Sequence, residues 1–194
     1  MKMCSKVDQT ATLSPQDNYF PEVLENCKEI CYNVENAKAK WRKLDEEVRI
    51  MAVTKTVPPE KVNFAVAQGF KLLGENRVQE FLSKKEAYDK SAEVQFIGHL
   101  QTNKVRDIID KVEMIESVHS EKLAAEISKQ ACKAGIIMDV LLEVNIGYEE
   151  SKSGFAPEET EAAVRKIAEM PGISVKGLMA IPPIDPLYEN TRKY

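Results

Sequence analysis

The residue whose chemistry stands out is Lys55, which ends the apolar stretch 48–54 and precedes two prolines. The stretch, V-R-I-M-A-V-T, predicts a buried strand, and Pro58 with Pro59 predicts the first turn of a helix. A lysine at a strand end lies where α/β folds place ligand-binding groups, although it can equally mark the solvated end of the strand. A neutral lysine amine attacks aldehydes, and burial or nearby positive charge lowers its pKa toward that state.

Other polar residues also follow apolar stretches along the chain. They are Thr54, Glu75, Asn76, His99, Gln101, His119, Asn145 and the turn 179–183. In a parallel sheet all these strand ends lie at one edge, so we expect them to converge at a single mouth. Strands end where apolar runs end, so chance also places polar groups there. A lone lysine, with no carboxylate pair and no Ser–His arrangement evident in the sequence, favours carbonyl chemistry without identifying a reaction.

The elements that must position these residues repeat a unit of strand and helix. We predict strands at 48–54, 70–74, 94–98, 112–118, 138–146 and 173–181, which implies parallel strands with crossover helices. Ser120 is expected to cap one helix and Gly135 to end it, and Pro157 is expected to open another. A long amphipathic helix is predicted from Phe20 to Leu44.

The length of 194 residues suits one domain. We therefore predict a disordered tail over 1–16 and a single domain over 17–194. The formal net charge of -4 comes from interspersed charges, which argues against a nucleic-acid partner. No apolar run approaches the roughly 18 residues that span a bilayer, and 1–15 lacks the centre of a signal peptide. We expect a soluble cytoplasmic protein that does not contact membranes.

The cysteines predict no metal site. Cys4, Cys27, Cys31 and Cys132 form no C-x-x-C pair, and neither histidine lies at metal-ligand spacing from them. Cys27 and Cys31 are four residues apart and are expected to pack as small apolar groups on one helix face.

The segment 147–154, G-Y-E-E-S-K-S-G, follows the fifth predicted strand. Its lysine and glycines are compatible with a lid or an anion contact, and equally with an ordinary loop between a strand and a helix. Neither G-x-G-x-x-G nor G-x-x-x-x-G-K-[ST] occurs in the chain, which argues against a dinucleotide site and a P-loop.

Five segments together resemble the pyridoxal phosphate homeostasis proteins, whose fold is similar to the barrel domain of alanine racemase. They are A-V-T-K-T at 52–56, G-E-N-R-V-Q-E at 74–80, F-I-G-H-L-Q-T-N-K at 96–104, S-K-S-G at 151–154 and G-L-M-A-I-P at 177–182. The resemblance implies a (β/α) TIM-type barrel of the alanine racemase N-terminal type that holds pyridoxal 5′-phosphate (PLP).

Four residues carry the resemblance to the cofactor site. Lys55 matches the lysine that forms a Schiff base with PLP, and Asn76 matches the asparagine of the G-E-N motif. His99 and Met179 lie on matching strand ends and are expected to line the cofactor pocket. The resemblance implies no catalytic residue and no metal.

The family's proteins look like non-catalytic binders that buffer PLP or deliver it transiently to PLP enzymes. The resemblance therefore implies a role in vitamin B6 homeostasis, and we expect a monomer. The residues agree, because Lys55 is the only evident nucleophile and the chain has no room for the second, mostly β domain of alanine racemase. Two alternatives stay open: an amino-acid racemase or lyase of the same fold, and a cofactor-free interaction module.

The chain departs from the family after 177–182. Family members add two further strands, a G-M-S-x-D motif and an R-x-G segment that holds the cofactor phosphate, whereas this sequence ends at Tyr194. Six strands do not close an eight-stranded barrel. We therefore expect a C-terminally truncated barrel with weakened selectivity for the phosphate ester.

Overall fold

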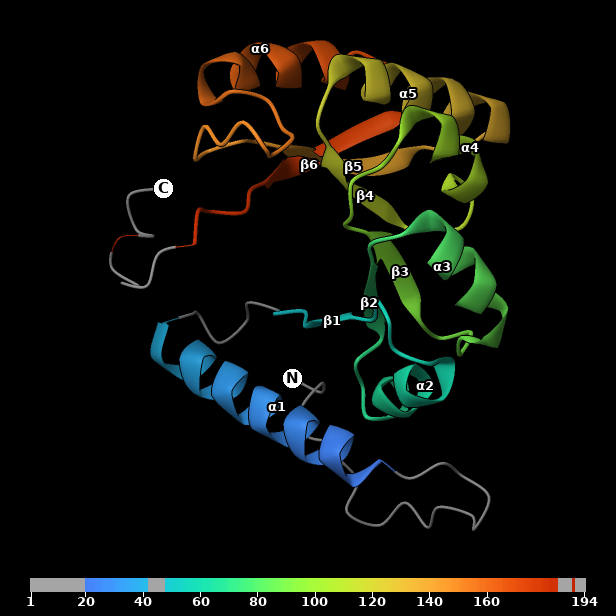
Figure 1. Cartoon of the computed structure of the whole chain (residues 1–194), viewed down its shortest axis with the longest axis vertical. Coiled ribbons are helices and arrows are strands. Elements are labelled where there is room, and N and C mark those ends of the chain that lie inside the picture. Colours follow the sequence, from blue (N-terminus) through green and yellow to red (C-terminus); the bar gives the residue numbers. More distant parts are fainter. Residues whose placement is uncertain (1–19, 42–47, 185–189, 191–194) are drawn as a thin grey trace. The chain divides into compact units, whose positions relative to one another are not determined.

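Helices and strands alternate along the chain in the structure, a computed structural model that describes residues 20–41, 48–184 and 190 (Figure 1). The elements are α1 (Pro21–Trp41), β1 (Met51–Val53), α2 (Pro59–Ala67), β2 (Leu72–Glu75), α3 (Val78–Lys84), β3 (Glu93–Phe96), α4 (Val105–Ile108), β4 (Met114–Val118), α5 (Glu121–Ala134), β5 (Met138–Glu143), α6 (Pro157–Ala168) and β6 (Ile173–Met179), with 3-10 turns at Lys85–Ala87 and Thr102–Lys104. The predicted tail over 1–16 lies outside the described residues.

The sheet confirms the six predicted strands and their parallel direction. Its strand order is β1-β2-β3-β4-β5-β6, which follows the sequence. The strands are mostly shorter than the apolar runs predicted. The first is limited to three residues because only Met51, Ala52 and Val53 pair with Leu72, Leu73 and Gly74. The fold class is α/β, as predicted.

Two compact units divide the chain. The first comprises Met1–Gly74 and Leu82–Glu93, and the second comprises Glu75–Phe81 and Val94–Tyr194. The predicted single domain over 17–194 stays a prediction.

In the first unit, the N-terminal end of α1 packs on α2 (Figure 1). The rings of Phe20 and Phe64 meet edge to face with centroids 5.8 Å apart, and Lys61 Nζ lies 3.0 Å from a carboxylate oxygen of Glu22. The predicted long helix is confirmed up to Trp41, while Leu44 lies outside the described residues. Cys27 is the buried residue of α1, and Trp41 is 75% exposed.

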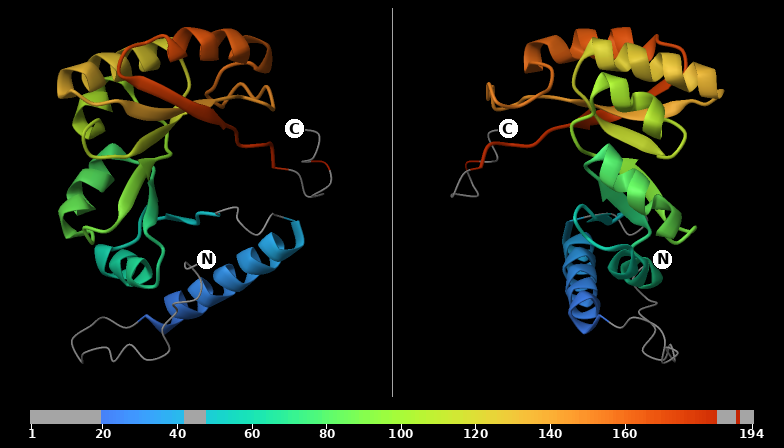
Figure 2. Two further views of the ribbon diagram at one scale, coloured as in Figure 1. Left: turned by 180° about the vertical axis from the view of Figure 1, so that it is seen from behind. Right: turned by 45° about the vertical axis from the view of Figure 1, so that its right-hand side comes forward.

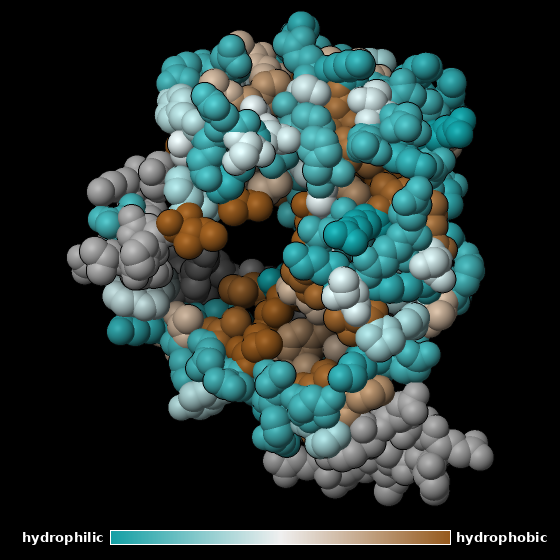
Figure 3. Space-filling view, viewed as in Figure 1, coloured by the Kyte–Doolittle hydropathy of each residue, from teal (hydrophilic) through white to brown (hydrophobic). Residues whose placement is uncertain are grey.

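In the second unit, β3 to β6 pair in order, and α4, α5 and α6 lie on one side of them (Figure 2). The core between helices and strands is aliphatic and aromatic: Phe96, Ile115, Leu123, Ile127, Val140, Leu142 and Ile167. The outward surface over α5 and α6 is mostly hydrophilic (Figure 3). This one-sided polarity fits helices that cover a buried parallel sheet.

Local sequence signals set the ends of several helices as predicted. Ser120 Oγ accepts a hydrogen bond from the backbone N–H of Leu123 at 3.3 Å, which caps α5. Gly135 ends the same helix with φ of +68°, a conformation that glycine adopts without strain. Pro59 and Pro157 occupy the first turns of α2 and α6. Among the described helices, none is long and apolar enough to span a lipid bilayer.

Candidate functional site

Lys55 directly follows β1, in a tight turn of the first unit. Thr54 before it is buried, and its N–H donates to the carbonyl of Gly74 at 3.0 Å. Thr56 after it has φ of +61°, which turns the chain sharply away from the strand. The side chain of Lys55 is exposed. The turn therefore fixes the backbone on both sides of Lys55 and leaves its amine accessible.

A second lysine contacts the same turn. Lys84 Nζ, at the end of α3, donates a hydrogen bond to the carbonyl oxygen of Thr54 at 3.3 Å. An ammonium group is thus bound to the residue that precedes Lys55. This contact ties the end of α3 to the turn that carries Lys55.

Asn76 follows β2 and belongs to the second unit. Its Oδ1 atom is buried and accepts no hydrogen bond from any described residue. A buried polar atom without a partner costs free energy unless something else satisfies it. The buried Oδ1 of Asn76 is therefore a candidate acceptor for a ligand, and its role at the cofactor stays a prediction.

His99 follows β3, and its exposed ring makes two contacts. It stacks on the ring of His119, with centroids 4.4 Å apart and planes inclined by 20°. Its Nδ1 atom lies 3.0 Å from Oγ of Ser153. Two predicted strand ends, those of β3 and β4, are thereby brought together with the loop after β5. The sequence analysis found no Ser–His arrangement, and the structure supplies one between residues far apart in the chain.

His119 is held by its own strand. Its Nδ1 lies 3.3 Å from the carbonyl oxygen of Ser117, and the hydroxyl of Ser117 donates to the carbonyl of Gly98. Burial lowers the pKa of His119, the charge of His99 lowers it further, and the carbonyl of Ser117 opposes both. His119 is therefore harder to protonate than an ordinary histidine.

A cavity of 360 Å³ opens beside His99. It is lined by His99, Glu143, Val144, Asn145, Ser151, Lys152, Ser153 and Ile181. Burial raises the pKa of Glu143, and the positive charge of His99 opposes that change. The cavity thus places a carboxyl group, an imidazole and two hydroxyl groups within one small volume.

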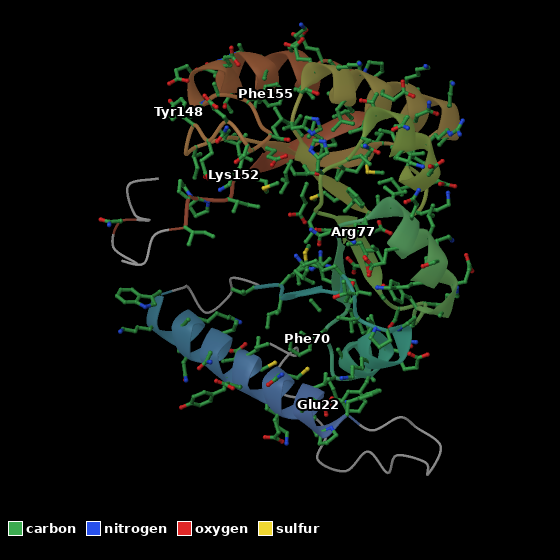
Figure 4. The ribbon with its side chains drawn as sticks, in the orientation of Figure 1. Glu22, Phe70, Arg77, Tyr148, Lys152 and Phe155 are labelled. Carbon is green, nitrogen blue, oxygen red and sulfur yellow. The ribbon has the colours of Figure 1, made fainter. Side chains whose placement is uncertain are left out.

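Three residues of the loop 147–154, Ser151, Lys152 and Ser153, line this cavity. Figure 4 labels Lys152 on this loop. The side-chain amide of Asn145 makes two hydrogen bonds to the backbone of Glu149. Its Nδ2 donates to the carbonyl of Glu149 at 2.9 Å, and its Oδ1 accepts from the N–H of Glu149 at 3.1 Å. Lys152 Nζ lies 2.6 Å from the Glu149 carboxylate and donates to the carbonyl of Ile181 at 3.4 Å. The loop is therefore an ordered wall of the cavity.

Of the four predicted cofactor residues, Lys55 lies in the first unit, and Asn76, His99 and Met179 lie in the second. The carbonyl of Met179 accepts a hydrogen bond from Val144 at 2.8 Å, while Ile181 lines the cavity. A shared pocket of all four residues stays a prediction. In the part of the chain that the structure describes, no three His, Cys, Asp or Glu side chains cluster as metal ligands.

Sequence reasoning missed Glu143 and Ser153 as cavity residues. Glu143 ends β5, whose burial alternates from residue to residue, but the alternation alone does not say which face meets a cavity. Ser153 belongs to the segment S-K-S-G, where only the lysine and glycine seemed distinctive. The S-K-S-G motif therefore included Ser153, but nothing in the sequence indicated the contact of Ser153 with His99.

Comparison with known proteins decides the family. Residues 26–190 match the model of the alanine racemase N-terminal domain. The pyridoxal phosphate homeostasis protein of Aquifex aeolicus is 46% identical to this chain over 147 residues, which are 75% of the chain and 64% of that protein. This chain belongs to the pyridoxal phosphate homeostasis protein family. The protein of that name from Pseudomonas aeruginosa is 35% identical over 161 residues, 82% of the chain and 70% of the relative.

Solved structures confirm the predicted alanine-racemase-type (β/α) barrel fold for the family member described here. An unknown protein from Bifidobacterium adolescentis superposes with a TM-score of 0.83 at 32% identity, over 89% of this chain and 74% of that one. PipY of Synechococcus elongatus, solved with PLP bound, gives 0.70 at 25% identity, over 84% and 74%. Alanine racemase of Clostridium difficile gives 0.68 at 19% identity, over 88% and 44%, and supports the fold alone.

Proposed function

We propose that this protein binds PLP reversibly through a Schiff base at Lys55 and serves vitamin B6 homeostasis. The observation that carries the proposal is the position of Lys55, exposed in a fixed turn directly after β1, in a chain of this family. PipY, a structural relative, has been solved with PLP bound, which supports the same ligand here. We further propose a monomeric cytoplasmic carrier that passes PLP to enzymes that need it.

Residues of both units support the proposal. The Nζ amine of Lys55 would hold PLP through the aldehyde that the cofactor supplies when bound, with release of one water molecule. Lys84, which donates to the carbonyl of Thr54, holds the turn that carries this amine. The buried Oδ1 of Asn76 provides a hydrogen-bonding position that a described residue does not fill. His99 and Met179 remain proposed lining residues.

We propose a binding role rather than turnover. The curated relatives are named as homeostasis proteins, and the likeness to alanine racemase at 19% identity concerns the fold. An assay of alanine racemisation by the purified chain with PLP tests the enzymatic alternative. Racemisation above the rate of free PLP would contradict the binding role.

The proposal is tested by labelling the purified chain with PLP. Borohydride reduces the imine to a stable amine, and peptide mass spectrometry then locates the adduct. We expect one adduct per chain, at Lys55, and its loss in Lys55→Ala. Lys176→Ala, which removes an exposed lysine on β6, is the matched control and should keep the adduct. Scattered labelling that is unchanged in Lys55→Ala would overturn the proposal.

A further inference from the structure

The segment F-I-G-H-L-Q-T-N-K at 96–104 contributes to two cavities of the second unit. His99 lines the cavity described above, whereas Thr102, Asn103 and Lys104 line another cavity of 360 Å³. These three residues form the 3-10 turn before α4. The proposed binding of PLP uses none of the three. A cavity of this size lies within the range of small-molecule sites, about 300–1,000 Å³.

Side chains from two helices complete this cavity, which we call the α4–α5 cavity. They are Arg106 and Asp107 of α4, and Glu126 and Gln130 of α5. The two helices pack against one another, and α5 also contacts the 3-10 turn (Figure 1). The α4–α5 cavity therefore lies in the helical layer of the second unit, and its lining shares no residue with the cavity beside His99.

The charged side chains of the α4–α5 cavity are distributed unequally between its elements. Lys104 Nζ and Arg106 Nε lie 3.8 Å and 3.4 Å from carboxylate oxygens of Asp107, so one carboxylate faces two cations. On α5, the side-chain amide of Gln130 donates a hydrogen bond to the carboxylate of Glu126. This hydrogen bond lowers the pKa of Glu126, whose carboxylate is charged at neutral pH. The side formed by residues 104–107 is therefore net positive, and α5 supplies negative charge to the lining.

A lining with both signs of charge disfavours ligands that carry one sign only. A phosphate or a dicarboxylate would meet Asp107 and Glu126, and a metal ion or a polyamine would meet Lys104 and Arg106. An α-amino acid carries a carboxylate and an ammonium close together, and it satisfies both signs at once. Arginine in particular binds carboxylates through paired N–H donors. The charges therefore favour a zwitterion.

We infer that the α4–α5 cavity binds a free α-amino acid, with its carboxylate at Lys104 and Arg106 and its ammonium at Glu126. The hydroxyl of Thr102 and the side-chain amides of Asn103 and Gln130 suit a polar side chain on this ligand. The ion pairs already present are open to solvent: Lys129, which lies 3.4 Å from Glu126, is exposed. Such pairs contribute little to stability, so a ligand displaces them at small cost.

This inference goes beyond cofactor binding and does not rest on it. Its test is an NMR titration of the full, isotope-labelled chain with L-glutamine as the probe and without PLP. We expect the backbone amide signals of 102–107 and of α5 to shift and to saturate. Half-saturation should fall on the order of 1 mM, because the cavity is polar rather than apolar. A chain whose signals do not shift would overturn the inference.

Two analogues of the probe test the two charges separately. Glutaramate is glutamine without the ammonium, and γ-aminobutyramide is glutamine without the carboxylate. Each should bind about tenfold more weakly than L-glutamine, the usual effect of losing a hydrogen bond between charged groups. If either analogue binds as well as L-glutamine, the site does not recognise a zwitterion and the inference fails.

Matched variants locate the binding. Arg106→Gln and Glu126→Gln should each weaken L-glutamine about tenfold, for the same reason. Arg165→Gln is the control for the first, because the side chains of Arg106 and Arg165 are both 76% exposed and both are paired with a carboxylate. Glu161→Gln, which removes the partner of Arg165, is the control for the second. Both controls lie on α6 and should bind L-glutamine like wild type. Equal losses in variants and controls would overturn the inference, and the analogues test it independently of any effect on folding.

Discussion

Gly98 lies against the backbone of Asn76 so closely that a Cβ on Gly98 would be 2.0 Å from the carbonyl oxygen of Asn76. No real Cβ tolerates that distance, so the ends of β2 and β3 approach only because position 98 lacks a side chain. The same approach brings together Asn76, whose Oδ1 atom is buried, and the start of the segment that bears His99. Glycine at 98 is therefore a requirement of the site as well as of the fold.

We expect Gly98→Ala to destabilise the chain by about 1–3 kcal/mol or more, as overpacking of a fixed backbone does. Urea denaturation measures the free energy of unfolding. Gly177→Ala is the matched control, because a Cβ there would lie 3.6 Å from Leu141, an ordinary contact. Equal stability of the two variants would show that the segment at 98 moves freely.

Ser120→Ala should lower the free energy of unfolding by about 1 kcal/mol, because it removes the hydrogen bond that caps α5. Chemical denaturation with circular dichroism detects a loss of this size. Ser120→Thr keeps a side-chain oxygen at the cap and should recover most of the stability. If the threonine variant is as unstable as the alanine variant, the cap is not the reason.

Glu143→Gln should stabilise the chain at neutral pH. Burial raises the pKa of Glu143 in the folded state above its ordinary value, so the folded chain binds more protons than the unfolded chain as pH passes the ordinary value. The stability associated with Glu143 is present below its ordinary pKa and is lost as pH rises through the folded value. The free energies of unfolding of wild type and variant should therefore be equal in acid and should differ at pH values above the ordinary pKa of glutamate. A gap that is independent of pH would contradict this assignment.

Thiol labelling should distinguish the cysteines. Cys27 on α1 is buried, and this burial raises the pKa of its thiol. Cys132 on α5 is exposed. We expect iodoacetamide to label Cys132 many times faster than Cys27 in the folded chain. Labelling in denaturant should abolish the difference, and peptide mass spectrometry reads both sites. Fast labelling of Cys27 under native conditions would show that α1 opens readily.

Lys84→Met should slow the formation of a PLP adduct at Lys55, because it removes the ammonium that binds the carbonyl of Thr54 and holds the turn before Lys55. The rate of rise of the imine absorbance measures the effect, which should be a few fold. Lys84→Arg keeps a hydrogen-bond donor at this position and should react faster than Lys84→Met. Equal rates in wild type and Lys84→Met would contradict this role of Lys84.

Much of the fold was predictable because its signals are local. The β-branched runs predicted all six strands, and Ser120 with Gly135 predicted both ends of α5. Strand bounds were less accurate, since a strand ends where pairing ends. β1 has three paired residues although its apolar run is longer.

The candidate site was predictable only in part because its contacts are distant in sequence. The polar residues at the strand ends predicted that His99 and His119 would lie close together, and the structure places their rings in contact. The pairing of His99 with Ser153 joins residues 54 positions apart and depends on how the loop after β5 is folded. That loop is set by the amide of Asn145, whose role the sequence does not reveal. The arrangement around Lys55 was likewise predicted only as a strand end, and the bond from Lys84 was not foreseen.

The strand order of the second unit has a consequence for how the chain acquires its structure. Gln95 pairs with Met114, Met114 with Asp139, and Met138 with Ile173, so each strand meets the strand that follows it in the sequence. Each pairing closes a crossover connection that contains a helix, and it requires no segment made later than the next strand. The sheet can therefore grow one strand at a time as the polypeptide leaves the ribosome, and the edge exposed at each stage is covered by the next strand to emerge.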